Sequence, residues 1–295
     1  MRTTAVLLIG ICGLLAKAFV GQSDSWGRLP SRSVAPAALW DQFLPKDPVD
    51  VPLNASALSN RLQDVIFTVM KKGLPQVDID LPAGLILGVE GEEPDELEPR
   101  ALQAKAGDSD KAKAAKKERE VRGDRELAGA FVQFFYEFKN SVNLCVLFRN
   151  PGLANLARTA WGDFGKARVV GFPSSKSVQD SADVAKLLRN RPWVLAVAPR
   201  ARQLRQLQEL SEMPDVKMQL ILANARVRCR KQGEDLRRDV ATASNPVLHV
   251  SFMSKDALVF KSIDTPWVMV RRDGTEIWRG DEEPSREVLL DVLKR

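Results

Sequence analysis

The sequence predicts an α/β fold, with a mostly parallel, Rossmann-like sheet flanked by helices and an antiparallel C-terminal extension. Between residues 124 and 223, short apolar runs alternate with segments of helical periodicity, which is typical of βαβ units whose sheet is covered on both faces. After residue 245, strand-like runs follow one another without helices between them, and the pair Asp273-Gly274 predicts a hairpin turn. The chain has 295 residues, 44% of them apolar, which is enough to build the core of such a fold.

The first predicted elements are a helix and a strand. Apolar side chains recur every three or four residues from Leu58 to Met70, which predicts an amphipathic helix. Gly73, followed by Pro75, is a normal helix stop. Residues 76–81 then alternate as in a strand, which ends at Pro82.

The remaining elements follow from the same two periodicities. We expect strands at residues 142–148, 167–172, 193–198 and 217–223, and helices at 127–139, 151–161, 181–189 and 200–213. The C-terminal part is expected to contain strands at 247–252, 257–263, 267–272 and 276–279, followed by a helix at 284–293. All of these elements belong to one predicted α/β domain over residues 52–293.

A charge-dense insert interrupts this domain at about residues 90–123. Its first part is acidic, and a stretch rich in Lys, Ala and Glu follows. Such a composition buries little apolar area, so we expect a solvated loop and a charged helix that contribute little to stability. An acidic docking segment for a basic partner is the alternative.

The first forty residues are typical of a targeting leader. Arg2, an apolar run and the small-residue site Ala16-Lys17-Ala18 predict a signal peptide over residues 1–18. Residues 19–40 begin with Phe19 and are rich in Ser, Arg, Pro and Ala, as in a transit peptide. The two segments together favour import into a complex plastid, with ordinary secretion as the alternative.

The composition argues against several kinds of chemistry. His249 is the single histidine, and only Cys145 and Cys229 follow the leader, so zinc sites, iron–sulfur clusters and a disulfide scaffold are unsupported. No G-x-x-x-x-G-K-[ST] phosphate loop is present. We therefore expect no catalytic residue, no metal and no cofactor, although an enzymatic role stays open.

The net charge says little for binding to nucleic acid. The whole chain carries +6, of which residues 1–36 contribute 4 − 1 = +3, so the remainder carries 6 − 3 = +3. Such a mild basic balance, with few aromatic residues near the basic positions, disfavours a nucleic-acid-binding function.

Basic and amide side chains follow three of the predicted parallel strands. Because ligands of parallel sheets bind beyond the carboxyl ends of the strands, these groups are expected to share one edge of the sheet. Arginine is suited to bidentate contacts with phosphate or carboxylate, so this edge is a candidate site for an anion or an acidic partner. The alternative is that these side chains only solvate loops and pair with nearby acids. The candidate residues are Arg149, Asn150, Arg200, Arg202, Asn224, Arg226 and Arg228.

Several short motifs, in order, resemble a plastid family, the domain of unknown function family 1995. This family includes the low-photosystem-II-accumulation assembly factors, and its domain is also fused to some plastid adenylate kinases. One departure is that Arg149-Asn150 follow Phe148, where family members often have Asp. The motifs are Val77-Asp-Ile-Asp-Leu81, Val146-Leu-Phe148, Val197-Ala-Pro199, Leu220-Ile-Leu-Ala-Asn224, Pro266-Trp267 and Glu283-Pro-Ser-Arg-Glu287.

The resemblance implies a non-catalytic plastid protein that assists the assembly or maintenance of photosystems through protein binding. Its partners would be photosystem subunits or assembly factors, and its location the stroma or the thylakoid periphery, where contact with the membrane surface is compatible with this role. The alternative function is an enzyme or binding protein for a phosphorylated small molecule or nucleotide at the basic sheet edge.

Overall fold

The computed structural model describes residues 47–97, 110–139, 144–162, 167–173, 184–186, 188, 192–213, 218–229, 239–240 and 242–294. The chain divides by its contacts into Met1–Asp47 and Pro48–Arg295, and the fold described below is that of the second unit. The predicted signal peptide and transit-like segment, residues 1–18 and 19–40, lie outside the described residues.

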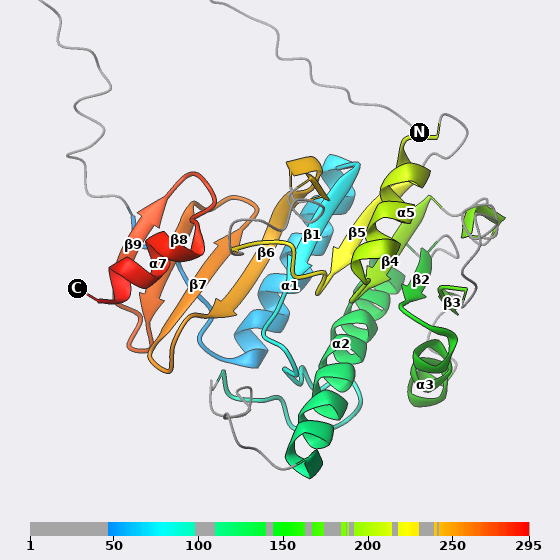
Figure 1. Ribbon diagram of the computed structural model, residues 1–295, viewed down its shortest axis with the longest axis horizontal. Coiled ribbons are helices and arrows are strands. Elements are labelled where there is room, and N and C mark those ends of the chain that lie inside the picture. Colours follow the sequence, from blue (N-terminus) through cyan, green and yellow to red (C-terminus); the bar gives the residue numbers. More distant parts are fainter. Residues whose placement is uncertain are drawn as a thin grey trace, which may run out of the picture. The chain divides into compact units, whose positions relative to one another are not determined.

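Within the described residues, nine strands form one sheet in the order β3-β2-β4-β5-β1-β6-β7-β8-β9 (Figure 1). Their bounds agree with the predicted strands to within a few residues. They are β1 (Gln76–Asp80), β2 (Leu144–Phe148), β3 (Arg168–Gly171), β4 (Trp193–Val197), β5 (Gln219–Ala223), β6 (Asn245–Phe252), β7 (Ala257–Ser262), β8 (Trp267–Arg271) and β9 (Glu276–Gly280).

The strand directions confirm the predicted mostly parallel sheet with an antiparallel extension. Strands β1 to β6 pair in parallel wherever they are neighbours, and β6, β7, β8 and β9 pair antiparallel in sequence order. One detail differs from the sequence-based expectation. Strand β6, which we placed in the antiparallel part, is parallel to β1, so it joins the two halves of a single sheet.

The helices also agree with the predicted pattern, except that α2 starts much earlier. Helix α1 is capped by the side chain of Asn54 and ends at Gly73, whose left-handed backbone (φ 62°) forms the expected stop. Of the helix predicted at 181–189, the described residues 184–186 and 188 are helical. The others are α1 (Ala55–Lys72), α2 (Asp110–Lys139), α3 (Pro151–Trp161), α5 (Ala201–Ser211) and α7 (Arg286–Leu293).

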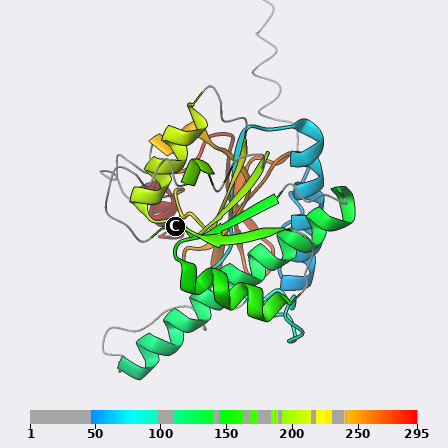
Figure 2. The same cartoon turned by 90° about the vertical axis from the view of Figure 1, so that its right-hand side faces the viewer.

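The two faces of the sheet are covered by different helices, as Figure 2 shows. Helices α1, α2 and α3 pack on one face, where Phe131 of α2 and Trp161 of α3 join the core. Helix α5 covers the parallel strands on the opposite face through Leu204 and Leu207. Helix α7 packs Leu289 against the antiparallel strands. Both faces of β2, β4 and β5 are therefore covered, which explains the nearly continuous apolar sequences of these three strands.

The connections change side between two adjacent strands, β2 and β4. The chain leaves β2 into α3 on one face and leaves β4 into α5 on the other face. Such a topological switch opens a crevice at the carboxyl ends of the two strands, which is where open α/β sheets bind their ligands. The backbone of Asn150, in the turn after β2, passes directly over Gly171. Only glycine fits at position 171, because a Cβ there would lie 2.3 Å from the carbonyl carbon of Asn150.

The charged insert is attached to the domain more closely than its composition suggests. Residues 110–139 form one continuous helix, α2, whose Gly123 packs directly on the backbone of Gly84. Asp95 pairs with Arg119, and Leu97 is buried. The expectation of a merely solvated insert therefore fails for these residues, because ion pairs and backbone contacts replace the missing apolar burial. Among the described residues, no helix is long and apolar enough to span a membrane.

Candidate functional site

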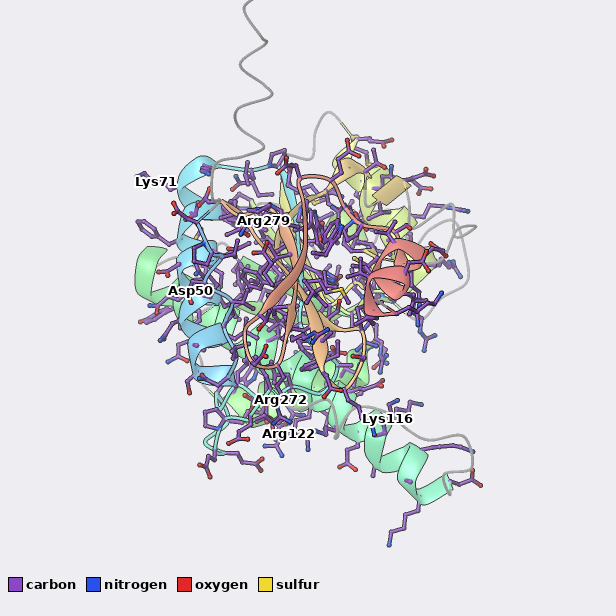
Figure 3. All side chains as sticks on the ribbon, turned by 90° about the vertical axis from the view of Figure 1, so that its left-hand side faces the viewer. Asp50, Lys71, Lys116, Arg122, Arg272 and Arg279 are labelled. Atoms are coloured by element: carbon purple, nitrogen blue, oxygen red, sulfur yellow. The ribbon has the colours of Figure 1, made fainter. Side chains whose placement is uncertain are left out.

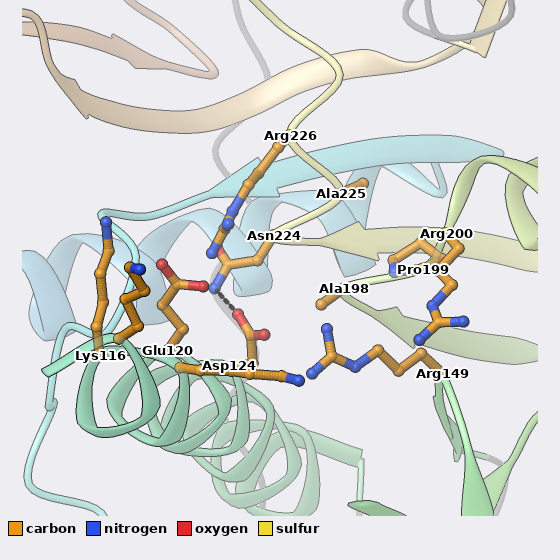
Figure 4. A pocket seen from close by; sticks show the side chains of 12 residues that line it. Lys116, Glu120, Asp124, Arg149, Ala198, Pro199, Arg200, Asn224, Ala225 and Arg226 are labelled. Carbon is orange, nitrogen blue, oxygen red and sulfur yellow. Dashed lines mark hydrogen bonds between the residues drawn. The ribbon is translucent and has the colours of Figure 1, made fainter. Parts of the chain in front are cut away.

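A pocket of about 520 Å³ lies at the carboxyl ends of β2, β4 and β5 and is bounded on one side by α2 (Figure 4). It coincides with the topological switch between β2 and β4. Its lining holds six basic side chains and two carboxylates. The lining residues are Lys113, Lys116, Lys117, Glu120, Asp124, Arg149, Ala198, Pro199, Arg200, Asn224, Ala225 and Arg226.

Arg149 and Arg200 come from the ends of two neighbouring strands and are held together by Gln203. The Gln203 side chain accepts a hydrogen bond from the backbone N–H of Arg200 (2.8 Å) and donates one to the backbone carbonyl of Arg149 (2.8 Å). Within the part of the chain that the structure describes, neither arginine forms an ion pair within 4.0 Å. Gln203 thus joins the backbones from which two cationic side chains enter the pocket, and neither side chain has an ion-pair partner, so an anion would stabilise them.

Asn224 and Asp124 form the buried floor of the pocket. The Asn224 side chain accepts a hydrogen bond from the backbone N–H of Leu81 (2.8 Å) and donates one to Oδ1 of Asp124 (2.9 Å). Both residues are buried. Burial raises the pKa of Asp124, whereas the hydrogen bond from Asn224 and the charges of Arg226 and Arg149 oppose that shift. Asn224 therefore ties three segments together: α2, the end of β1 and the end of β5.

The backbone of this edge is strained at three lining positions. Ala198, Asn224 and Arg226 adopt φ angles of 44°, 51° and 54°, in the left-handed region that is unfavourable for residues with a Cβ. The backbone N–H of each forms a hydrogen bond: that of Ala198 with the carbonyl of Ala223 (2.8 Å), that of Asn224 with the carbonyl of Ile79 (2.8 Å), and that of Arg226 with Oδ1 of Asp80 (2.9 Å). Such conformations persist only where the surroundings enforce them, and they gather at functional sites.

Helix α2 supplies a basic wall that the sequence analysis missed. Lys113, Lys117, Glu120 and Asp124 follow one another at intervals of three or four residues and so share one face of the helix, and Lys116, next to Lys117, lies four residues before Glu120 on the same side. Figure 3 shows the side chains along this part of α2, where Lys116 is labelled. The sequence predicts a charged helix in this insert, but one that is solvated and separate from the helix expected at 127–139, so it does not place these lysines beside the strand ends.

The structure brings together four of the seven candidate residues. Arg149, Arg200, Asn224 and Arg226 line the pocket, as their positions after parallel strands predict. Asn150 instead caps α3, its side chain accepting a hydrogen bond from the N–H of Leu153 (2.9 Å). Arg202 is exposed on α5, outside the pocket lining.

Arg228, the seventh candidate, does not line the pocket. Its side chain is only 7% exposed and pairs with the fully buried carboxylate of Asp78 at 2.6 Å and with Glu283 at 2.9 Å. It also donates to the backbone carbonyl of Ser244. Three acceptors already occupy its guanidinium group, so it links β1 to the C-terminal segment instead of facing a ligand.

A second buried polar cluster lies beside this ion pair. The His249 ring faces Asp80, with Nδ1 3.8 Å from Oδ2, and its Nε2 lies 2.9 Å from the hydroxyl of Ser251. Burial lowers the pKa of His249 to about 4 and, with the charge of Asp78, raises the pKa of Asp80 to about 7. Each shift favours the neutral form of its group over the charged form, compared with the same group in water. His249 also packs on the ring of Trp267, in keeping with a structural role.

The ionisable groups of the pocket are lysines, arginines and two carboxylates, and its lining holds no serine, threonine, cysteine, tyrosine or histidine. In the described part of the chain, no group of three His, Cys, Asp or Glu side chains could hold a metal ion. Such a site can hold an anion and can accept hydrogen bonds from it.

Comparison with known proteins gives one match. A family model described as "Domain of unknown function (DUF1995)" matches residues 55–289, which spans the sheet, the helices and the pocket. No curated protein and no solved structure matches the chain.

Proposed function

We propose that this chain, which belongs to the DUF1995 family, is a binding protein whose pocket at the switch between β2 and β4 holds a phosphorylated small molecule. The observation that carries the proposal is the convergence of Arg149, Arg200 and Arg226 from three separate strand ends into one pocket. Residues so far apart in sequence meet there only because the parallel sheet aligns the strand ends.

Two features of the pocket favour phosphate as the anion. The Gln203 side chain joins the backbones of Arg149 and Arg200, and the guanidinium groups that enter the pocket from these two strand ends suit bidentate contacts with phosphate. Lys116 and Lys117 face the same space from α2 and add to the positive potential.

The test is a double charge reversal, Arg149→Glu with Arg200→Glu, and calorimetric titration with inorganic phosphate at low salt. Because each charge-assisted hydrogen bond contributes about 1.5–3 kcal/mol, we expect affinity to fall by more than about tenfold. The fold should persist, since neither side chain has an ion-pair partner to lose. The matched control, Arg205→Glu with Arg286→Glu, makes the same change in net charge on exposed side chains outside the pocket. An equal loss in both double variants would mean that only the overall charge matters.

The resemblance supports a second proposal, that the protein assists photosystem assembly through photosystem subunits or assembly factors as partners. Affinity purification from the source plastid tests it: we expect photosystem subunits to co-purify with the wild-type chain. If their recovery also falls in Arg149→Glu with Arg200→Glu, the pocket serves that interaction. Absence of photosystem subunits from the wild-type preparation would contradict this role.

The plastid location is likewise a proposal, supported by Ala16-Lys17-Ala18 followed by Phe19. We expect a reporter fused to residues 1–40 to reach the stroma, and Phe19→Ala to stop it before the stroma. Unchanged stromal import of the variant would contradict this interpretation of the leader.

A further inference from the structure

The pocket pairs its basic side chains with two carboxylates, and this combination narrows the chemical class of its ligand. Glu120 and Asp124 lie on one face of α2, one helical turn apart, which is about 6 Å along the helix. Figure 4 shows them between Lys116 on one side and the pair Arg149 and Arg200 on the other. Both carboxylates therefore line the space that a ligand would occupy.

Carboxylates in an anion site oppose the anion unless they bind something else. Ionised carboxylates only accept hydrogen bonds, and the doubly ionised phosphate group of an ester has no proton to donate to them. Asn224 donates a hydrogen bond to one oxygen of Asp124 (2.9 Å). Glu120 is half-buried, and its charge lies close enough to raise the pKa of Asp124. The remaining acceptor positions call for donors that arrive with the ligand.

Two kinds of donor group could meet these carboxylates, and the surrounding charge decides between them. An ammonium group would have to enter among Lys113, Lys116, Lys117, Arg149, Arg200 and Arg226, all of which repel it. A neutral hydroxyl group meets no such opposition and donates well to a carboxylate. Acidic side chains bind ribose hydroxyls in the same way in nucleotide sites of doubly wound sheets.

The size of the pocket agrees with a ligand larger than a bare anion. Its volume of about 520 Å³ lies in the range of sites for small organic molecules. A single phosphate at Arg149 and Arg200 would leave the space beside Glu120 unfilled.

Building on the proposed function, we infer that the ligand is a phosphate ester of a polyhydroxylated molecule, that is, a sugar phosphate or a nucleotide. Its phosphate binds Arg149 and Arg200, and its hydroxyl groups donate to Glu120 and Asp124. Gln203 is a positioning residue for the phosphate, and Asn224 is one for Asp124.

The experiment compares two kinds of probe in one variant, Glu120→Met, which removes the charge and the acceptors at similar length. The probes are inorganic phosphate and a panel of ribose 5-phosphate, glucose 6-phosphate and adenosine monophosphate, titrated by calorimetry. In the wild-type chain, we expect at least one ester to bind about tenfold tighter than phosphate, the effect of one or two additional hydrogen bonds. In the variant, affinity for that ester should fall, whereas affinity for inorganic phosphate should rise.

Because the affinity for the ester and the affinity for inorganic phosphate are expected to change in opposite directions, the experiment tests this inference separately from the proposed function. If Glu120→Met raises affinity for phosphate and for every ester by the same factor, the carboxylates do not bind hydroxyls, and the inference falls while the anion site stands. If no ester binds tighter than phosphate in the wild-type chain, the inference falls as well. If neither phosphate nor any ester binds, the proposed function falls with it. Glu118→Met, an exposed position on the same helix outside the pocket lining, is the matched control and should change neither affinity.

Discussion

Arg228 and Asp78 form a buried ion pair across 150 residues of sequence, with Nη2 of the arginine 2.6 Å from Oδ1 of the aspartate. Asp78 is fully buried in the central strand β1, and Nε of Arg228 contacts its other oxygen at 3.1 Å. Glu283, just before α7, completes the cluster by accepting from Arg228 and from the backbone N–H of Cys229 (2.7 Å). The pair therefore connects the middle of the parallel sheet to the C-terminal segment.

This connection predicts that Arg228→Glu unfolds or strongly destabilises the domain. Removing one partner of a buried pair leaves an uncompensated charge, which costs about 3–5 kcal/mol, and the new carboxylate would repel Asp78 as well. The free energy of unfolding, from urea denaturation, measures the effect. Exposed Arg205 offers the control, since Arg205→Glu should change stability by no more than about 0.5 kcal/mol. Equal stabilities of the two variants would show that the ion pair contributes nothing.

The neighbouring Asp80 and His249 predict opposite dependences of stability on pH. Asp80 has a folded pKa of about 7, above its unfolded value, so its contribution is complete below about pH 4 and is lost as pH rises through 7. His249 has a folded pKa of about 4, below its unfolded value of about 6.5, so its contribution is present above pH 6.5 and is lost as pH falls through 4. Between pH 4 and 6.5 the two groups therefore change the free energy of unfolding in opposite directions. The charges of Asp78 and Arg228 act on both groups.

Single variants should reveal the two opposed slopes. Relative to the wild type, Asp80→Asn should gain stability more steeply as pH rises from 4 to 6.5, because only the histidine effect remains. His249→Gln should lose stability more steeply as pH rises from 4 to 7. Each slope is at most about 1.4 kcal/mol per pH unit. Urea denaturation at half-unit pH steps measures both, and parallel curves for the three proteins would contradict the assigned pKa shifts.

Gln203 predicts a loss of binding without direct contact to the ligand. Gln203→Met removes the hydrogen bonds to the backbones of Arg200 and Arg149, so the two strand ends that carry these arginines lose their common anchor. We expect phosphate affinity to fall about tenfold and stability to fall by about 2 kcal/mol, the value of two hydrogen bonds.

The control for this positioning role is Gln206→Met, a half-buried position on the same helix outside the pocket lining. It should leave phosphate affinity unchanged. In the background of Arg149→Glu with Arg200→Glu, Gln203→Met should cause no additional loss, because the groups that it positions are already gone. An additive loss would place Gln203 in contact with the anion itself.

Local patterns predicted the strands and four of the residues that line the pocket, because residues that follow parallel strands must meet at one edge. Arg149, Arg200, Asn224 and Arg226 could be found in this way. The role of Arg228 could not, since its acceptor Asp78 lies in a strand 150 residues earlier and nothing in the local sequence identifies a buried partner. The lysines of α2 were missed for a different reason: charge density was equated with solvation, although Asp124 and Gly123 anchor that helix to the domain.

The insert gives a prediction opposite to the one that its composition suggests. Asp95 accepts hydrogen bonds from the backbone N–H of Ile86 (2.8 Å) and from Nη2 of Arg119 (2.8 Å), so it fixes the loop after β1 to α2. The fully buried Glu126 accepts from the N–H of Val89 (2.8 Å) and holds the same loop from the other end.

Deleting residues 90–120 should therefore lower the melting temperature, because it removes Asp95, the buried Leu97 and the start of α2 together. The point variant Asp95→Ala isolates one of these links and should cost about 1–3 kcal/mol, because the N–H of Ile86 and the guanidinium of Arg119 lose their acceptor. Glu93→Ala, an exposed neighbour, is the control and should leave stability within about 0.5 kcal/mol of the wild type. Scanning calorimetry of the deletion and of the two point variants measures these effects. An unchanged melting temperature after the deletion would mean that these contacts add no stability. The segment would then be solvated, as its charge density alone suggests.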